Sequence, residues 1–163
     1  MIEKILVAVN SYSDNLLDFD SVIFLAKSTD ATLMLLHVLS ETDPDYPEFP
    51  SHVYYQVLKN PDCHEYQSTL LQYEQQTLDT LQNLTEMAIA AGVKAEYAQL
   101  NGLPGPVICE VADNWSANLI IVGKRKLKGL HKMFLGSVSN YVTHHAPCSV
   151  LIMHASNSAI DVY

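Results

Sequence analysis

The chain has 163 residues, a formal net charge of −9 and a hydrophobic content of 48%. This length fits one domain that builds its own core, and the negative charge disfavours nucleic acid as a general partner. No apolar run approaches the ~20 residues of a membrane-spanning helix, and the first residues do not follow the pattern of a signal peptide. We therefore expect a cytoplasmic protein that does not bind membranes.

Five short segments predict strands, four of them apolar runs, and four segments between them have helical spacing. The expected strands are residues 4–9, 32–38, 93–100, 118–122 and 149–153. The expected helices are residues 15–28, 66–91, 104–115 and 137–144. Continuous apolar strands are typical of a parallel sheet covered on both faces. The alternation predicts one α/β domain, residues 1–155, with a doubly wound sheet, and residues 156–163 as a flexible tail.

The helices carry their own boundary and burial signals. Ser13 or Asp14 is the predicted N-cap of the first helix, and Asp30 is its predicted end. Gly92 stands where a C-cap glycine follows the second helix. The apolar stripe expected to face the core in that helix consists of Leu71, Leu78, Leu81, Leu84 and Ala88.

Residues 40–65 interrupt the alternation of strands and helices. They hold four of the seven prolines: Pro44, Pro47, Pro50 and Pro61. Because proline fixes φ and lacks an N–H donor, we expect a long loop here. Its aromatic residues favour packing over disorder. A loop of this length is usually functional or partly mobile, and the sequence leaves open whether it closes over a ligand or faces a partner protein.

A candidate anion site lies between Gly123 and Ser139. Gly123 follows a predicted strand, at the end of the strand where open α/β sheets bind ligands. Gly136 and the next three residues open a helix, whose free N–H groups and positive dipole end suit phosphate. Five of the nine basic residues lie within this segment: Lys124, Arg125, Lys126, Lys128 and Lys132. The alternatives are serines that only cap a helix and a basic run that is an ordinary solvated face.

The spacing of this segment resembles the G-x2-G-x9-G-S/T pattern of the universal stress proteins, with Gly123, position 126 and Gly136-Ser137 in the matching places. Three further segments are similar to the family: residues 4–9, residues 36–38 and Gly102-x-Pro104. The resemblance covers residues 2–154. It implies a flavodoxin-like five-stranded parallel sheet of order 3-2-1-4-5, a homodimer and, in one branch of the family, ATP binding.

The resemblance also implies which positions form a nucleotide site. The adenine side carries over to Ala8, Val9, Asn10 and Val38, and the phosphate side to Val122, Gly123, Arg125, Lys126, Gly136, Ser137, Val138 and Ser139. Lys126 replaces the second glycine, so its side chain either blocks one phosphate contact or supplies an ammonium in its place. Asn10 replaces the family's Asp, and an amide can still bond a ribose hydroxyl. The implied cofactor is ATP or AMP, and whether Mg²⁺ accompanies it is open.

The function that we expect is a nucleotide-binding stress-response or signalling module. No catalytic residue is recognisable, so any ATP hydrolysis should be slow. The alternative is a dimeric adaptor of the same fold that has lost nucleotide binding and recognises an unknown protein. A flavin carrier is a third, weaker alternative, because residues 10–13 lack the Thr/Ser-Gly richness of a flavin phosphate loop.

Three further expectations concern edges and histidines. The last strand is apolar (Val150, Leu151, Ile152 and Met153), and because an uncovered apolar edge invites aggregation, we expect a homodimer through it. His144 and His145 point about 100° apart on a helix, and residues 62–65 lack a second ligand cluster, so no metal site is expected. His37, in an apolar strand, is expected to be a hydrogen-bonded core histidine.

Overall fold

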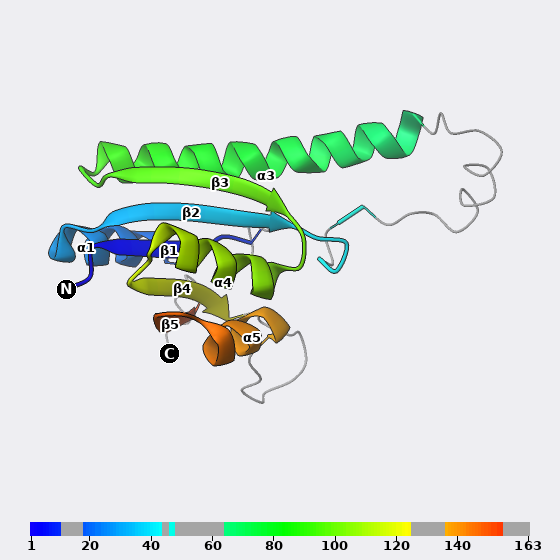
Figure 1. The fold of residues 1–163 in the computed structure, drawn as a ribbon. Coiled ribbons are helices and arrows are strands. Elements are labelled where there is room, and N and C mark those ends of the chain that lie inside the picture. The colour runs from blue at the N-terminus through cyan, green and yellow to red at the C-terminus, as the bar shows by residue number, and fades with distance from the viewer. Residues whose placement is uncertain (11–17, 44–45, 48–63, 125–135, 155–163) are drawn as a thin grey trace, which may run out of the picture.

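The structure is a computed structural model that describes residues 1–10, 18–43, 46–47, 64–124 and 136–154. Five strands form one parallel sheet in the order β3-β2-β1-β4-β5 (Figure 1). The strands are β1 (Lys4–Ala8), β2 (Thr32–Leu39), β3 (Ala95–Asn101), β4 (Leu119–Lys124) and β5 (Ser149–His154). The helices are α1 (Phe19–Thr29), α3 (His64–Ala90), α4 (Pro104–Trp115) and α5 (Ser137–His145). The predicted fold class and strand order are confirmed.

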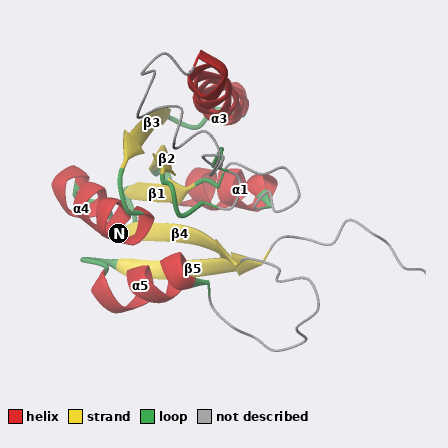
Figure 2. Ribbon diagram, turned by 90° about the vertical axis from the view of Figure 1, so that its right-hand side faces the viewer, coloured by secondary structure: helices red, strands yellow, loops and turns green. Residues whose placement is uncertain are grey.

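Helices cover both faces of the sheet, with α1 and α3 on one face and α4 and α5 on the other (Figure 2). Successive side chains of β1 alternate between these two layers. Ile5 and Val7 are buried in the core on the α1 and α3 side, and Leu6 is buried in the core on the α4 and α5 side. Burial on both faces is why β1 is continuously apolar, whereas the edge strand β3 has a mixed sequence and no buried residue.

The start of α1 differs from the prediction. Its N-cap is Asp18, whose carboxylate accepts hydrogen bonds from the backbone N–H and the hydroxyl of Ser21. The predicted caps Ser13 and Asp14 are therefore wrong for the helix that the structure describes. The predicted end is confirmed, since Asp30 has a left-handed backbone with a φ of 54°. Gly92 likewise follows α3 with a φ of 87°, which glycine adopts without strain.

The buried stripe of α3 is partly corrected. Leu81, Leu84 and Ala88 are buried, but Leu71 is 65% exposed. Tyr73 and Thr77 continue the buried stripe instead, at the same helical spacing. Positions 71 and 73 are two residues apart, so their side chains point about 160° apart around the helix, and Leu71 lies away from the side that buries Tyr73 and Thr77. The first turns of α3 extend beyond the strands (Figure 1), and Tyr73 packs edge-on against Tyr46, whose ring centroid lies 5.6 Å away.

Several sequence-based expectations fall outside the described residues. These are most of the loop over residues 40–65, the basic residues from Arg125 to Lys132, and the tail from residue 156. Within the part of the chain that the structure describes, no helix is long and apolar enough to cross a membrane.

Candidate functional site

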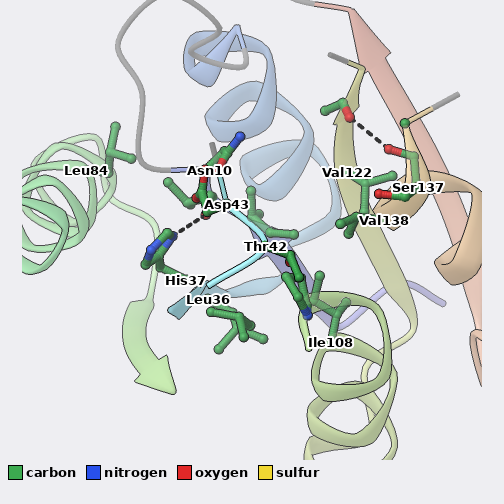
Figure 3. Close-up of a pocket in the computed structure, with 18 of the residues that line it drawn as sticks. Asn10, Leu36, His37, Thr42, Asp43, Leu84, Ile108, Val122, Ser137 and Val138 are labelled. Atoms are coloured by element: carbon green, nitrogen blue, oxygen red, sulfur yellow. Dashed lines mark hydrogen bonds between the residues drawn. The ribbon is translucent and has the colours of Figure 1, made fainter. Parts of the chain in front are cut away.

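A cavity of about 210 Å³ opens at the carboxyl ends of β1, β2 and β4 (Figure 3). The chain reverses its direction of travel across the sheet between β1 and β4, and open α/β sheets bind ligands at such a switch point. The first residues of α1, α4 and α5, together with Leu84 of α3, complete the wall. The lining residues are Val7, Ala8, Val9, Asn10, Phe19, Leu36, His37, Val38, Thr42, Asp43, Leu84, Pro104, Ile108, Val122, Gly123, Gly136, Ser137, Val138 and Ser139.

The N-terminus of α5 forms one end of the cavity. Gly136 is its N-cap and makes no side-chain cap bond, and the first intrahelical bond runs from the N–H of Asn140 to the carbonyl of Gly136, at 2.9 Å. The N–H groups of Ser137, Val138 and Ser139 precede that bond, so they have no acceptor within the helix. No acidic residue stands in this first turn. No carboxylate within this turn therefore offsets the positive end of the helix dipole.

The two serines of this turn have different surroundings. The Ser139 hydroxyl is buried and donates to the carbonyl oxygen of Gly123 at 2.9 Å. Ser137 is exposed at the mouth of the cavity, so its hydroxyl is accessible. Since Gly136 is the N-cap, the reading of either serine as a capping residue is wrong. The Ser139 side chain joins β4 to α5, which leaves its N–H and the Ser137 hydroxyl for a ligand.

Aliphatic side chains form the middle of the cavity. Leu36 and Val38 project from the same face of β2, and both belong to the core cluster that also holds Ile108 of α4. Pro104 occupies the first turn of α4 and closes the same side. This wall is apolar and suits a flat ring rather than a charged group.

Polar residues gather at the end of the cavity near α3 (Figure 3). His37 is 2% exposed, and its Nδ1 lies 2.9 Å from the carbonyl oxygen of Val9. Burial lowers the pKa of His37 below its ordinary value, although the Val9 bond and the charge of Asp43 act in the opposite direction. The Asp43 carboxylate accepts a hydrogen bond from the Tyr73 hydroxyl at 3.2 Å. His37 is thus a buried core histidine as predicted, but it is bonded through Nδ1 alone, because its Nε2 has no hydrogen-bond partner among the described residues.

The structure brings most of the predicted site residues to this one cavity. Ten of them line it: Ala8, Val9, Asn10, Val38, Val122, Gly123, Gly136, Ser137, Val138 and Ser139. Arg125 and Lys126 lie outside the described residues. Sequence reasoning missed the acceptors at the far end, above all Asp43. Leu36 could have been predicted as a lining residue, because it lies two residues before Val38 and therefore on the same face of the strand. No sequence pattern indicated Asp43.

No group of three or more potential metal ligands occurs among the residues that the structure describes. In the predicted histidine pair, the Nδ1 of His145 lies 2.9 Å from the Tyr141 carbonyl, and its ring stacks on Tyr141 at 4.0 Å between centroids. His145 therefore packs within its own helix.

A parallel sheet of order 3-2-1-4-5, helices on both faces and a cavity at the switch point define a flavodoxin-like α/β domain. The model of the universal stress protein family matches residues 1–154, and the chain belongs to this family. Universal stress protein YxiE of Bacillus subtilis is 33% identical over 153 residues, which cover 94% of this chain and 99% of the relative. Universal stress protein Sll1388 of Synechocystis sp. is 48% identical over 82 residues, which cover 49% of this chain and 53% of the relative.

Solved structures share this fold at low sequence identity. A universal stress protein family member from Arabidopsis thaliana with AMP bound has a TM-score of 0.62 and 19% identity, covering 95% of this chain and 93% of its own. The universal stress protein from Archaeoglobus fulgidus in complex with dAMP has a TM-score of 0.58 and 19% identity. The match covers 94% of this chain and 99% of that structure's chain. At 19% identity, the similarity to these two structures supports the fold alone.

Proposed function

We propose that the cavity binds an adenine nucleotide, ATP or AMP, and that the protein acts as a nucleotide-responsive stress or signalling module. The observation that carries this proposal is the composition of one cavity. Free N–H groups at the start of α5 form one end, and the apolar wall of Leu36, Val38 and Ile108 lies beside them. A phosphate and a purine ring are the two chemistries that these surfaces suit.

The phosphates lie against Gly123 and the first turn of α5. They accept hydrogen bonds from the backbone of Ser137, Val138 and Ser139 and from the Ser137 hydroxyl. Gly136 lets the backbone approach the anion, because it has no side chain at the N-cap. Arg125 and Lys126 add positive charge to this end in the proposed complex.

The adenine and ribose occupy the remainder of the cavity. The base lies against Ala8, Val9 and Val38, and the amide of Asn10 bonds a ribose hydroxyl. Family members of this fold that were solved with AMP and with dAMP support an adenine nucleotide as the ligand class. An amide at position 10 supplies no full charge for a cation, so we propose that any Mg²⁺ is held by the phosphates.

Binding rather than turnover is the proposed activity. Asp43 is the acidic residue among those that line the cavity, and it belongs to the end away from α5. A phosphoryl-transfer site needs a group that positions the attacking water next to the terminal phosphate. We therefore propose that hydrolysis of ATP, if measurable, is slow compared with dedicated ATPases.

Calorimetric titration of the whole chain with ATP and AMP tests this proposal. A Gly136→Asp/Ser137→Ala variant should lose binding, since a carboxylate at the N-cap repels phosphate and a donor is removed. Its unfolding curve should match that of the wild type, which separates a lost site from a lost fold. If neither nucleotide releases heat nor raises the melting temperature at high micromolar concentration, the proposal fails and the non-nucleotide adaptor is favoured.

We also propose a homodimer through β5. This strand lies at the edge of the sheet, and none of residues 149–153 is fully buried. Leu151 is 38% exposed. Pairing with a second copy would cover this apolar edge and satisfy its free backbone groups.

A further inference from the structure

We propose that the Nε2 of His37 accepts a hydrogen bond from a neutral donor of the bound ligand, an O–H or N–H group at the end opposite the phosphate. The cavity would then select ligands that carry an anion at one end and a donor at the other. This inference rests on the proposed nucleotide function and adds a selectivity element to it. In an adenine nucleotide, the candidate donors are the ribose hydroxyls and the amino group of the base.

The hydrogen bond at Nδ1 determines what Nε2 can do. The Val9 carbonyl oxygen, 2.9 Å from Nδ1, can only accept, so Nδ1 carries the proton. In a neutral imidazole with its proton on Nδ1, the Nε2 atom is an acceptor. Burial lowers the pKa of His37 and keeps the ring neutral near pH 7. The partner that Nε2 lacks is therefore a donor.

No protein group on the described part of the chain supplies that donor. Nε2 is buried without a hydrogen-bond partner there, and such groups are uncommon because they lose the bonds that water gave them. The nearby Asp43 offers a carboxylate, which is also an acceptor and which already accepts from the Tyr73 hydroxyl. Two acceptors thus stand together at this end of the cavity.

The two ends of the cavity are complementary to different parts of one ligand. His37 and Asp43 lie on the side of the cavity near Leu84 of α3, whereas Ser137 and Val138 lie on the opposite side (Figure 3). N–H donors at the start of α5 suit an anion, while acceptors at the other end repel one and require a donor. A ligand with phosphate alone would satisfy only one of these two ends.

Contact with Nε2 requires a small change in the cavity wall. Less than 1 Å² of this atom is accessible, so an entering hydroxyl or amino group must displace a neighbouring side chain. The turn at Thr42 and Asp43 lies near His37, and Thr42 is exposed, so we expect this part of the wall to move. Its hydrogen bonds include those of Thr42 with the Ser40 hydroxyl, the bond from the Asp43 N–H to the Ser40 carbonyl and the Asp43–Tyr73 bond.

Two variants of His37 distinguish the contributions of its two ring nitrogens to ligand binding. In His37→Asn the amide nitrogen can take the place of Nδ1 and keep the Val9 bond, while nothing replaces Nε2. In His37→Gln the amide oxygen can reach the Nε2 position and restore the acceptor. We expect calorimetry to show AMP binding weakened about tenfold in His37→Asn, the effect of one buried hydrogen bond, and largely recovered in His37→Gln.

Nucleotide analogues identify the donor. The titrations are repeated with 2′-deoxy-AMP, 3′-deoxy-AMP and inosine monophosphate, which lack the 2′-hydroxyl, the 3′-hydroxyl and the amino group. The analogue that lacks the donor to Nε2 should bind the wild type and His37→Asn equally. If the His37→Asn substitution leaves AMP affinity unchanged, or weakens all three analogues as much as AMP, the proposal is overturned.

The ¹⁵N resonance of His37 Nε2 gives a readout that does not depend on affinity. An acceptor nitrogen that gains a donor should shift toward the protonated range when saturating AMP is added to the wild type. AMP that binds without moving this resonance overturns the inference and leaves nucleotide binding intact. If the wild type binds no nucleotide at all, the proposed function and this inference both fail.

Discussion

The hydroxyl of Ser139 donates a 2.9 Å hydrogen bond to the carbonyl oxygen of Gly123, which joins the start of α5 to the end of β4. These are the two ends of the segment that the sequence predicts to hold phosphate. This bond links both ends directly and holds the first turn of α5 beside the end of β4. The site is therefore pre-organised at this end, which lowers the entropic cost of binding.

Replacing Ser139 by alanine should destabilise the protein. The change removes the Ser139 donor from the partly buried Gly123 carbonyl, and we expect a loss of about 1–2 kcal/mol in the free energy of unfolding. Urea denaturation at constant m-value measures this loss. Ser137→Ala is the matched control, because Ser137 is exposed on the same turn. A loss no larger than that of the control would mean that the bond contributes nothing.

Gly105 should not tolerate a side chain while Tyr141 is present. A Cβ atom at position 105 would lie 2.6 Å from the Cδ1 of Tyr141 and 2.8 Å from its Cγ. Alanine improves helix propensity by up to about 1 kcal/mol, but overpacking of this kind typically costs 1–3 kcal/mol, so we expect Gly105→Ala to be destabilising. The double-mutant cycle with Tyr141→Ala checks the cause. In that background Gly105→Ala should be neutral or stabilising, and the same loss in both backgrounds would refute the packing argument.

The stability of the protein should depend on pH through His37. Burial lowers the pKa of this residue in the folded state below 6.5, whereas the unfolded chain takes up the proton near 6.5. Between these two values the unfolded state binds more protons, so stability falls as the pH falls. The contribution of His37 is complete above pH ~6.5 and is lost as the pH decreases toward the lowered value.

His37→Asn isolates this effect from the other histidines, because asparagine does not titrate. The difference in unfolding free energy between the wild type and this variant should shrink as the pH is lowered from neutral to mildly acidic values. Urea denaturation at several pH values measures it. A difference that stays constant with pH would show that the folded-state pKa is not lowered.

The Tyr73 hydroxyl should hold the turn that follows β2. Tyr73→Phe removes its bond to the Asp43 carboxylate, and we expect a loss of roughly 0.5–1.5 kcal/mol in stability. Because Asp43 lines the cavity, nucleotide affinity should also change. Tyr97→Phe is the matched control, since the Tyr97 hydroxyl accepts an exposed bond from Gln82 far from the cavity. Equal effects of both variants on nucleotide affinity would argue against a link between the turn and the site.

The proposed dimer predicts the behaviour of a single substitution. Leu151→Glu puts a charge on the exposed side of β5, where a second copy would pair, so the variant should be monomeric while the wild type is dimeric. The fold should persist, because Leu151 is not part of the buried core. Light scattering at micromolar concentration measures both masses. A monomeric wild type would contradict the proposal.

Strands packed between two helical layers were predictable from the sequence. The buried side and the ends of helices, which pack on one face of the sheet, were harder to predict. The central strand β1 was recognised because both helical layers require apolar residues there, as at Ile5 and Leu6, whereas the edge strand β3 has a mixed sequence. Leu71 was assigned to the buried face because it lies seven residues before Leu78, whereas contacts with β3 and with Tyr46 bury Thr77 and Tyr73 on a different side of the helix. The N-cap at Asp18 was missed because several serines and aspartates near it carry the same local signal.

The sequence alone determined the order of the elements and the glycine-serine start of α5, because hydrophobic periodicity and helix-start chemistry are local properties. Only the tertiary structure showed that the Ser139 hydroxyl already bonds to Gly123, that Asp43 joins the site, and that His37 has one nitrogen bonded and one without a partner. Each of these facts depends on contacts between residues far apart in the chain. Such contacts arise when the sheet brings the carboxyl ends of its strands together, and no local pattern contains them.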